Sequence, residues 1–340
     1  MGARARTHQT CAEQPCPASG QAGIITGVTT AQPSSRPRAI ECPLPGAVAD
    51  VLLAPFTTMG TGGPVDWFVQ VQTADELVAA IEWARAEQVE YFVLGVGANI
   101  VFTDAGFRGL VIRNELADIT WEAQRVTVAS GVVFGELILA ALERSLSGFE
   151  HFVGIPSTVG GAMWQNLHFL SPDRQSTMYL GDIVHAATIY EPGASTQVRT
   201  VDQAHFAFGY DDSILQHTEQ VVLDTTFALT PASAEHIREV MWANAAWRAE
   251  KHPPGATTCS AGSIFRKIEG HGAGRLIDQA GLKGHRIGGM QISAQHANFF
   301  MNVGGGTTAD LQALIDLAIT RVRAGTGLEL RPEVTIIGSR

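Results

Sequence analysis

The chain has 340 residues, 45% of them hydrophobic and only 16% charged, and its formal net charge is −10. A chain this long and this apolar buries a sizeable core, which excludes general disorder, and its length is typical of two or three domains. The negative balance argues against binding to nucleic acid or to an anionic membrane surface, so an anionic ligand needs a local positive site. No apolar stretch approaches the roughly 18 residues that a transmembrane helix requires.

Residues 1–45 are predicted to form a disordered or loosely attached tail, because Pro, Ser, Gly, Thr and Gln are frequent there and apolar periodicity is lacking. The apolar run 22–28 is too short for a secretory signal and contains Gly23 and Gly27. We therefore expect a cytoplasmic protein. Cys11 and Cys16 do not have a usual zinc-ligand spacing, so no metal site is predicted.

Helices and strands alternate in the next part of the chain. Leu77, Ile81 and Ala84 have helical spacing, which predicts a helix over 74–87 with Thr73 as its N-cap. Short apolar runs predict strands over 91–94, 100–102 and 110–112. This β-α-β order indicates an α/β subdomain.

The second half continues with mixed elements. Strands are predicted over 125–130, 184–190, 196–200 and 220–229, and helices over 134–145, 233–247 and 309–323. Gly325 and Gly327 are expected to cap the end of the last helix.

Two glycine-bearing loops stand out, Gly95 to Asn99 and Gly154 to Gly161. Neither is a Walker A loop or a Rossmann fingerprint. Taken alone, each is compatible with a simple turn. Small residues also expose backbone N–H groups that can bind a diphosphate, and two such loops in one α/β region suit a dinucleotide such as FAD.

Eight motifs then occur in a recognisable order. They are TMGTGGP (58–64), LGVGANIV (94–101), GIPSTVGGAMWQN (154–166), FGYDDSI (208–214), SAGSIFRK (260–267), QAGLKGHRIGG (279–289), HANF (296–299) and LRPEVTIIG (330–338). Over residues 50–340 the chain resembles the UDP-N-acetylenolpyruvoylglucosamine reductase (MurB) family. Ordered motifs indicate common descent more strongly than identical chemistry.

The resemblance implies a mixed α/β and α+β fold: a two-subdomain FAD-binding fold of the vanillyl-alcohol-oxidase type followed by a C-terminal α+β substrate domain. The expected boundaries are residues 46–229 for the FAD-binding domain, with subdomains of about 46–113 and 114–229, and 230–340 for the substrate domain. It also implies non-covalent FAD, NADPH as reductant, a nucleotide-sugar or other small-molecule substrate, and a role in peptidoglycan synthesis. We expect a monomer.

The resemblance also implies roles for individual residues. Ser263 matches the serine that protonates the carbanion formed when hydride adds to the enolpyruvyl double bond, Glu333 matches the glutamate beside it, and Asp211 stands at a catalytic position. Substrate binding is expected at Tyr210, Lys251, Lys267 and His296. Cofactor binding is expected at Gly95, Val96, Gly97, Ala98, Asn99, Ile100, Gly154, Ile155, Ser157, Thr158, Gly160, Gly161, Gln165 and Asn166.

Elementary chemistry supports these roles in outline. A serine hydroxyl is a weak acid that becomes competent when the acceptor is a carbanion and a neighbour such as Glu333 relays charge. The alternative interpretations are a helix or turn cap for Ser263, a surface charge for Glu333 and a solvated charge for Lys251.

Several positions depart from the family motifs. Asp211 replaces the arginine of F-G-Y-R-D-S, Lys267 replaces an asparagine, and Ala98 replaces a serine. The small residues that follow Gln165-Asn166 in the family are replaced by LHFLS (167–171), in which His168 is expected to be a core residue rather than a flavin attachment point. A carboxylate at 211 exchanges attraction for repulsion toward an anionic substrate.

Three hypotheses about function therefore stand. The first is an NADPH-driven, FAD-dependent reductase of the MurB type. The second is a MurB-derived flavoenzyme with a different substrate in specialised metabolism, and the third is a non-catalytic protein that binds a flavin or a nucleotide.

Overall fold

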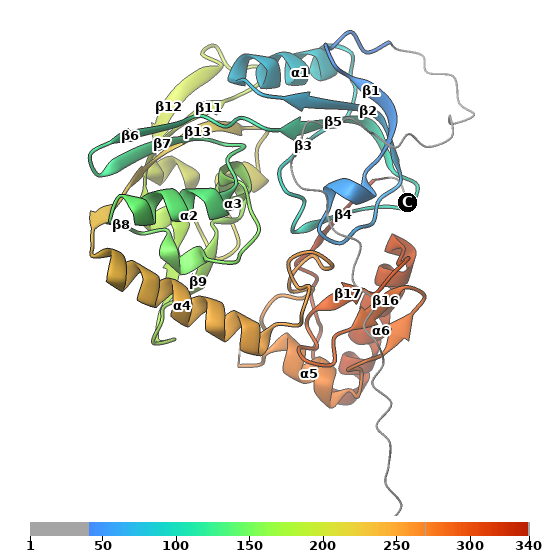
Figure 1. The fold of residues 1–340 in the computed structure, drawn as a ribbon. Coiled ribbons are helices and arrows are strands. Elements are labelled where there is room, and N and C mark those ends of the chain that lie inside the picture. Colours follow the sequence, from blue (N-terminus) through green and yellow to red (C-terminus); the bar gives the residue numbers. More distant parts are fainter. Residues whose placement is uncertain (1–40, 269, 339–340) are drawn as a thin grey trace, which may run out of the picture.

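The computed structural model describes residues 41–268 and 270–338. Most of the predicted tail, including Cys11 and Cys16, therefore lies outside the described residues. The described chain forms two sheets with helices on them and a smaller C-terminal α+β part, which lies at the lower right of Figure 1. Within the described residues, no helix is long and apolar enough to cross a membrane.

The first sheet has the strand order β1-β2-β5-β3. Strands β2, β5 and β3 are parallel, and β1 pairs antiparallel with β2. Helix α1 (Ala74–Ala86) lies on this sheet and begins where predicted, because the Thr73 side chain accepts a hydrogen bond from the Glu76 backbone N–H and Glu76 reciprocates. The strand bounds are β1 Val48–Leu52, β2 Pro64–Val71, β3 Tyr91–Leu94 and β5 Phe107–Asn114.

The second sheet is antiparallel throughout, with the order β12-β11-β13-β7-β6. Its bounds are β6 Ile119–Glu122, β7 Arg125–Ala129, β11 Val184–Tyr190, β12 Val198–Asp202 and β13 Val221–Ala228. Helices α2 (Phe134–Glu143) and α3 (Val159–Gln165) lie on one side of it (Figure 1). Buried side chains of both sheets, such as Val69 of β2 and Phe227 of β13, belong to one hydrophobic core, so the two sheets are packed together rather than linked loosely.

The C-terminal part contains a three-stranded sheet, β15 (Arg286–Ile287), β16 (Met290–Ile292) and β17 (Phe300–Asn302), with α5 (Ala273–Gln279) and α6 (Thr308–Thr326). Leu311 and Ile315 of α6 share a core with Met59 and Val101 from the first half of the chain. Strand β18 (Thr335–Ile337) returns to pair in parallel with β4 (Ile100–Phe102). The C-terminal part is therefore anchored on the first subdomain through both packing and backbone pairing.

Helix α4 (Ala234–Lys251) runs along the lower side of the molecule, from the second sheet to the C-terminal part (Figure 1). Strand β14 (Thr230–Pro231), which ends shortly before α4 begins, pairs with the short strand β8 (Leu146–Ser147). The domain boundary at 229/230 remains a prediction. Other short elements are β9 His168–Leu170, β10 Thr177–Tyr179, η1 Ala54–Phe56, η2 Glu150–Phe152, η3 Leu180–Ile183, η4 Gln203–Phe206 and η5 Ile214–Gln216.

The predicted end of the last helix needs one correction. Gly327 ends α6 in the left-handed conformation, with φ +74°, and its N–H donates to the Arg323 carbonyl. Gly325 lies inside the helix, so the prediction that it caps the end was wrong; one glycine with positive φ suffices for this cap.

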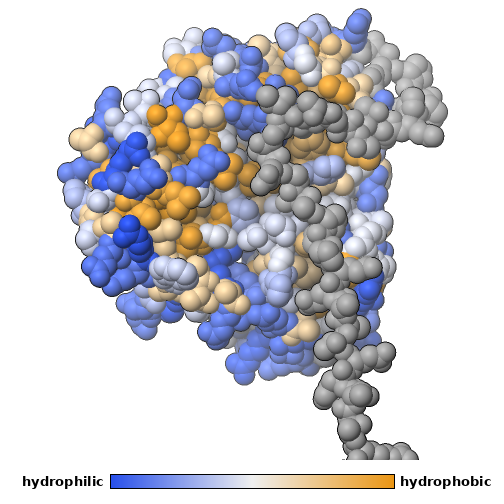
Figure 2. Space-filling view, in the orientation of Figure 1, coloured by the Kyte–Doolittle hydropathy of each residue, from blue (hydrophilic) through white to orange (hydrophobic). Residues whose placement is uncertain are grey.

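The space-filling view shows hydrophobic residues over α2 on the visible face (Figure 2). Leu139 of α2 has one of the more exposed large apolar side chains, at 56%. A single exposed leucine on a helix is common in folded proteins and does not by itself indicate a binding site.

Candidate active site

Two cavities lie where the three parts of the described chain meet. The larger has a volume of about 1170 Å³ and is lined by both glycine loops, and the smaller has a volume of about 460 Å³ and is lined mainly by the C-terminal part. Five residues line both, and we call this set the junction: His168, Tyr210, Ser263, Lys267 and Glu333. Four of the junction residues were singled out by the sequence motifs, and His168 was expected to be a core residue.

The first glycine loop connects β3 to β4 and approaches other segments closely. Gly97 has φ +66°, and a Cβ there would lie 2.3 Å from the Phe56 carbonyl oxygen. A Cβ on Gly95 would lie 2.6 Å from Oγ1 of Thr158, which belongs to the second loop. Both glycines are required because the backbone itself forms the wall of the larger cavity.

The second loop leads directly into α3. Thr158 is the N-cap, and its hydroxyl accepts a hydrogen bond from the Gly161 N–H. Gly160 and Gly161 therefore occupy the first turn of a helix, where the Gly160 N–H donates to the Ser130 carbonyl at 2.7 Å and the Gly161 N–H to the Thr158 hydroxyl at 3.2 Å. A Cβ on Gly160 would lie 3.2 Å from the Ser130 side chain, so the helix also packs closely on the end of β7.

Twelve of the fourteen predicted cofactor residues line the larger cavity: Gly95, Val96, Gly97, Ala98, Asn99, Ile100, Ile155, Ser157, Thr158, Gly160, Gly161 and Gln165. Asn166 is not among the lining residues. It ends α3 with φ +49°, and its amide bonds the Gly209 carbonyl and the Gly181 N–H, which indicates a structural role. Gly154 is not among them either; its carbonyl accepts a hydrogen bond from Arg248.

Replacing Gly97 by alanine should destabilise the fold and weaken cofactor binding, because the added Cβ meets the backbone of residues 56–57 and the positive φ disfavours an L side chain. We expect a lower melting temperature and loss of bound flavin after purification. The matched control is Gly135→Ala in α2, where nothing lies within 4 Å of the new Cβ. A Gly97→Ala protein with the wild-type melting temperature and full flavin content would contradict the assignment.

Backbone pairing in the C-terminal part sets Ser263 beside Glu333. Ser263 forms a bridge with Phe299, and Phe265 forms a bridge with Pro332. The Glu333 N–H donates to the Ile264 carbonyl at 2.8 Å. The two segments therefore run side by side, although they are far apart in sequence, and the junction receives a hydroxyl from one and a carboxyl group from the other.

The carboxyl group of Glu333 is held largely in its acid form at neutral pH. Burial raises the pKa of Glu333 to about 8, the negative charge of Asp211 acts in the same direction, and Arg266 and Lys267 act against it. Burial also raises the pKa of Tyr210 to about 12, so the phenol keeps its proton. The junction thus offers three neutral O–H groups, those of Ser263, Tyr210 and Glu333, beside the cation Lys267.

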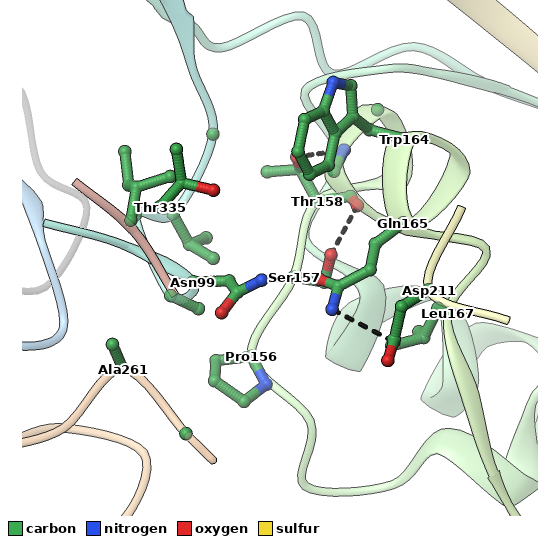
Figure 3. Close-up of a pocket in the computed structure, with 18 of the residues that line it drawn as sticks. Asn99, Pro156, Ser157, Thr158, Trp164, Gln165, Leu167, Asp211, Ala261 and Thr335 are labelled. Atoms are coloured by element: carbon green, nitrogen blue, oxygen red, sulfur yellow. Dashed lines mark hydrogen bonds between the residues drawn. The ribbon is translucent and has the colours of Figure 1, made fainter. Parts of the chain in front are cut away.

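Asp211 belongs to a chain of side-chain contacts that crosses the larger cavity. The Asn99 amide donates to Gln165 at 3.1 Å, and Gln165 donates to Oδ1 of Asp211 at 3.2 Å. Figure 3 shows Gln165 between Asn99 and Asp211, with a dashed line to the carboxylate. On its other side, Oδ1 of Asp211 lies 3.5 Å from Nδ1 of His168.

Among the predicted substrate residues, Tyr210 and Lys267 belong to the junction, and His296 lines the smaller cavity alone. Lys251 lines neither cavity and pairs with Glu250 at the surface. Within the described residues, Lys267 and Arg266 form no ion pair, which leaves their positive charges for a ligand.

Sequence reasoning missed Arg248, one helical turn before Lys251. Its guanidinium lines the larger cavity, lies over the Phe169 ring and donates to the Gly154 carbonyl. Burial lowers the pKa of Arg248 to about 10. The signal was present in the i, i+3 spacing of Arg248 and Lys251, which places the two on one side of the helix.

Comparisons with known proteins agree with the resemblance. The pattern of the UDP-N-acetylenolpyruvoylglucosamine reductase C-terminal domain matches residues 253–337, and that of an FAD binding domain matches residues 65–198. The chain is 37% identical over 293 residues to a UDP-N-acetylenolpyruvoylglucosamine reductase of Streptococcus suis, a match that covers 85% of this chain and 93% of the relative. It is 35% identical over 296 residues to the enzyme of the same name from Streptococcus thermophilus, covering 86% and 93%.

A solved structure is also similar. The crystal structure of UDP-N-acetylenolpyruvylglucosamine reductase (MurB) from Thermus caldophilus matches with a TM-score of 0.70 and 31% sequence identity, covering 84% of this chain and 97% of that chain. The expected fold class, an FAD-binding fold followed by a MurB-type C-terminal domain, is confirmed.

Proposed function

The chain belongs to the UDP-N-acetylenolpyruvoylglucosamine reductase family, and we propose that its two joined cavities carry out that family's reaction with the residues named below. The chain is an FAD-dependent oxidoreductase of peptidoglycan synthesis. It reduces the enolpyruvyl group of a UDP-linked sugar, and NADPH is the reductant. The assignment of roles rests on the junction. There the hydroxyl of Ser263, the carboxyl group of Glu333 in its acid form and the lysine Lys267, all from the C-terminal part, line the cavity that the glycine loops form.

The larger cavity fits FAD. Its wall is backbone at Gly95, Gly97 and Gly160, where added Cβ atoms would meet neighbouring atoms at 2.3–3.2 Å, and its volume exceeds that of a typical drug-sized site. We propose that the backbone of the two loops and the side chains of Asn99, Thr158 and Gln165 hold the cofactor. Once reduced by NADPH, the FAD held there would supply the hydride that adds to the enolpyruvyl double bond.

Ser263 is proposed to donate the proton. Hydride addition leaves negative charge on the carbon next to the substrate carboxylate, and this carbanion is a strong enough base to take a proton from a hydroxyl group. The buried acid form of Glu333 lies beside Ser263 and stabilises the charge that remains on its oxygen.

Lys267, which lines both cavities, is proposed to bind the substrate carboxylate, and Arg266, which lines neither, is proposed to add positive charge nearby. Both are unpaired within the described ion pairs, and both lower the pKa of Glu333, which places their charges close to the acid. A cation at this place compensates for the carboxylate at position 211, where the family motif has arginine.

Replacing Lys267 by methionine should raise the KM for the nucleotide sugar by about 10- to 100-fold, because a hydrogen bond between two charged groups is lost. The same change at Lys251 should have a smaller effect, because Lys251 lies outside both cavities. Arg321→Met on the exposed side of α6 is the control. Steady-state kinetics of NADPH oxidation measure all three; equal effects at 251 and 267 would contradict the role of Lys267.

The other hypotheses are not favoured. Identity of 35–37% over more than four-fifths of the chain accompanies a site that keeps both Ser263 and Glu333 at the junction, which argues for the family reaction and for catalysis. The cytoplasmic location and the monomeric state remain predictions.

A direct test begins with a visible spectrum of the purified protein. We expect a yellow protein whose flavin absorbance is bleached by NADPH under anaerobic conditions. A colourless protein that cannot be reconstituted with FAD would overturn the proposed function.

A further inference from the structure

Two positions at which this chain departs from its family's motifs meet in the structure. Asp211 replaces an arginine, and His168 stands in the stretch LHFLS (167–171), which replaces small residues of the family motif. Nδ1 of His168 lies 3.5 Å from Oδ1 of Asp211. The two departures therefore form one feature of the site, a histidine–carboxylate pair.

The pair is buried at one end and open at the other. The Asp211 side chain is 4% exposed, whereas that of His168 is 21% exposed and lines both cavities. The side-chain amide of Gln165 donates a hydrogen bond to Oδ1 of the Asp211 carboxylate. His168 on β9 also packs against Tyr179 of β10 and Tyr210, with ring centroids at 5.4 and 4.7 Å. These contacts restrain the ring, and the side chain lines both cavities, where a ligand in the junction would meet it.

The surroundings keep the ring neutral near pH 7. Burial lowers the pKa of His168, and the charge of Lys267 lowers it further, while Asp211 and the Asn166 carbonyl oppose the shift. A carboxylate at Nδ1 favours the tautomer with the proton on that nitrogen, which leaves the lone pair on Nε2 as a hydrogen-bond acceptor. The titratable or charged groups that face His168 are Tyr179, Tyr210, Asp211, Lys267 and, across the junction, Glu333.

We propose that His168 determines substrate specificity by accepting a hydrogen bond at Nε2 from a hydroxyl or amide N–H of the nucleotide sugar, and that Asp211 is the positioning residue that holds this tautomer. The inference rests on the proposed function, in which Lys267 binds the substrate carboxylate. The His168–Asp211 pair then binds an uncharged hydrogen-bond donor on another part of the substrate. The exchange of arginine for aspartate at position 211 therefore changes the substrate group that is recognised, from the carboxylate to an uncharged donor.

The test is calorimetric binding of the enolpyruvyl nucleotide sugar to the oxidised holoenzyme, without NADPH, between pH 5.5 and pH 8. Wild-type affinity should fall as the pH is lowered, because protonation removes the acceptor. His168→Ala should bind about tenfold more weakly at pH 7.5 and lose the pH dependence that wild type shows on the acid side. His168→Gln, which retains a polar group near the position of Nε2, should recover part of the affinity.

A double-mutant cycle isolates the role of Asp211. Asp211→Asn suits the backbone, because φ is +53° there and asparagine tolerates that region. The substitution should weaken binding severalfold in the wild type and have little effect in the His168→Ala background, since it acts through the ring. The control is Asp212→Asn, which alters a surface pair of the same composition with His217, at 2.8 Å.

Four results would overturn the inference. Affinity that rises on acidification would show that His168 binds an anion as a cation. Equal binding by wild type and His168→Ala, or additive effects in the cycle, would show that the pair is only structural. A substrate that binds as described but is not reduced would contradict the proposed function alone, and a substrate that does not bind the wild type would overturn both.

Discussion

Replacing Ser263 by alanine is expected to slow reduction of the enolpyruvyl group by a factor of about 10²–10⁴, while bleaching of the flavin by NADPH proceeds at the wild-type rate. The variant retains the cavity walls and the cations, so substrate still binds. It lacks the hydroxyl proton that the carbanion requires at the junction. Anaerobic stopped-flow absorbance separates the two half-reactions, because flavin colour is lost in the first and returns in the second.

Ser157→Ala is the matched control, since Ser157 lines only the larger cavity and its hydroxyl donates to the Thr158 carbonyl. At saturating FAD we expect this variant to return the flavin colour at the wild-type rate. If Ser263→Ala did so too, another group would be the proton donor, and the role proposed for Ser263 would be wrong.

The second large effect concerns Glu333. Its pKa of about 8 predicts that the rate of the second half-reaction is constant at lower pH and declines by about tenfold per pH unit above 8, as the acid form disappears. Glu333→Gln should lower the rate and remove this decline. A Glu333→Gln variant with the same alkaline decline as the wild type would assign the titration to a different group.

The same carboxyl group makes stability depend on pH, and stability also falls as the pH rises. Its pKa is raised from the ordinary 4.5 to about 8 on folding, so the folded state binds more protons than the unfolded state between these values. The contribution of Glu333 to stability is fully present below pH 4.5 and is lost as the pH rises through 8, at a cost on the order of 4 kcal/mol. We therefore expect Glu333→Gln to raise the melting temperature at pH 8 and to leave it nearly unchanged at pH 4.5.

The regular elements follow closely from local patterns. The helix after Thr73 and the strands at 91–94 and 100–102 have the predicted bounds to within one residue. The cap and the apolar spacing that define them depend only on residues that are close together in the sequence. Helix α5 was not predicted, since its seven residues are too few to show a periodic pattern.

The site was predicted where it depends on motifs and missed where it depends on tertiary contacts. Ser263 and Glu333 were named from their motifs, and the structure brings them to one junction. The contact between His168 and Asp211 was not predictable, because a single sequence does not show that two positions far apart in the chain lie side by side in the fold. The same limit explains Asn166, whose neighbours Gly181 and Gly209 are distant in sequence.

The central claim is that this chain reduces an enolpyruvyl group despite the carboxylate at position 211. The most direct measurement is anaerobic addition of the enolpyruvyl nucleotide sugar to the wild-type enzyme after one equivalent of NADPH has bleached its flavin. Our account predicts that the flavin absorbance returns in a single turnover and that the product gains two hydrogen atoms by mass. Flavin that stays bleached in the presence of bound substrate would contradict it.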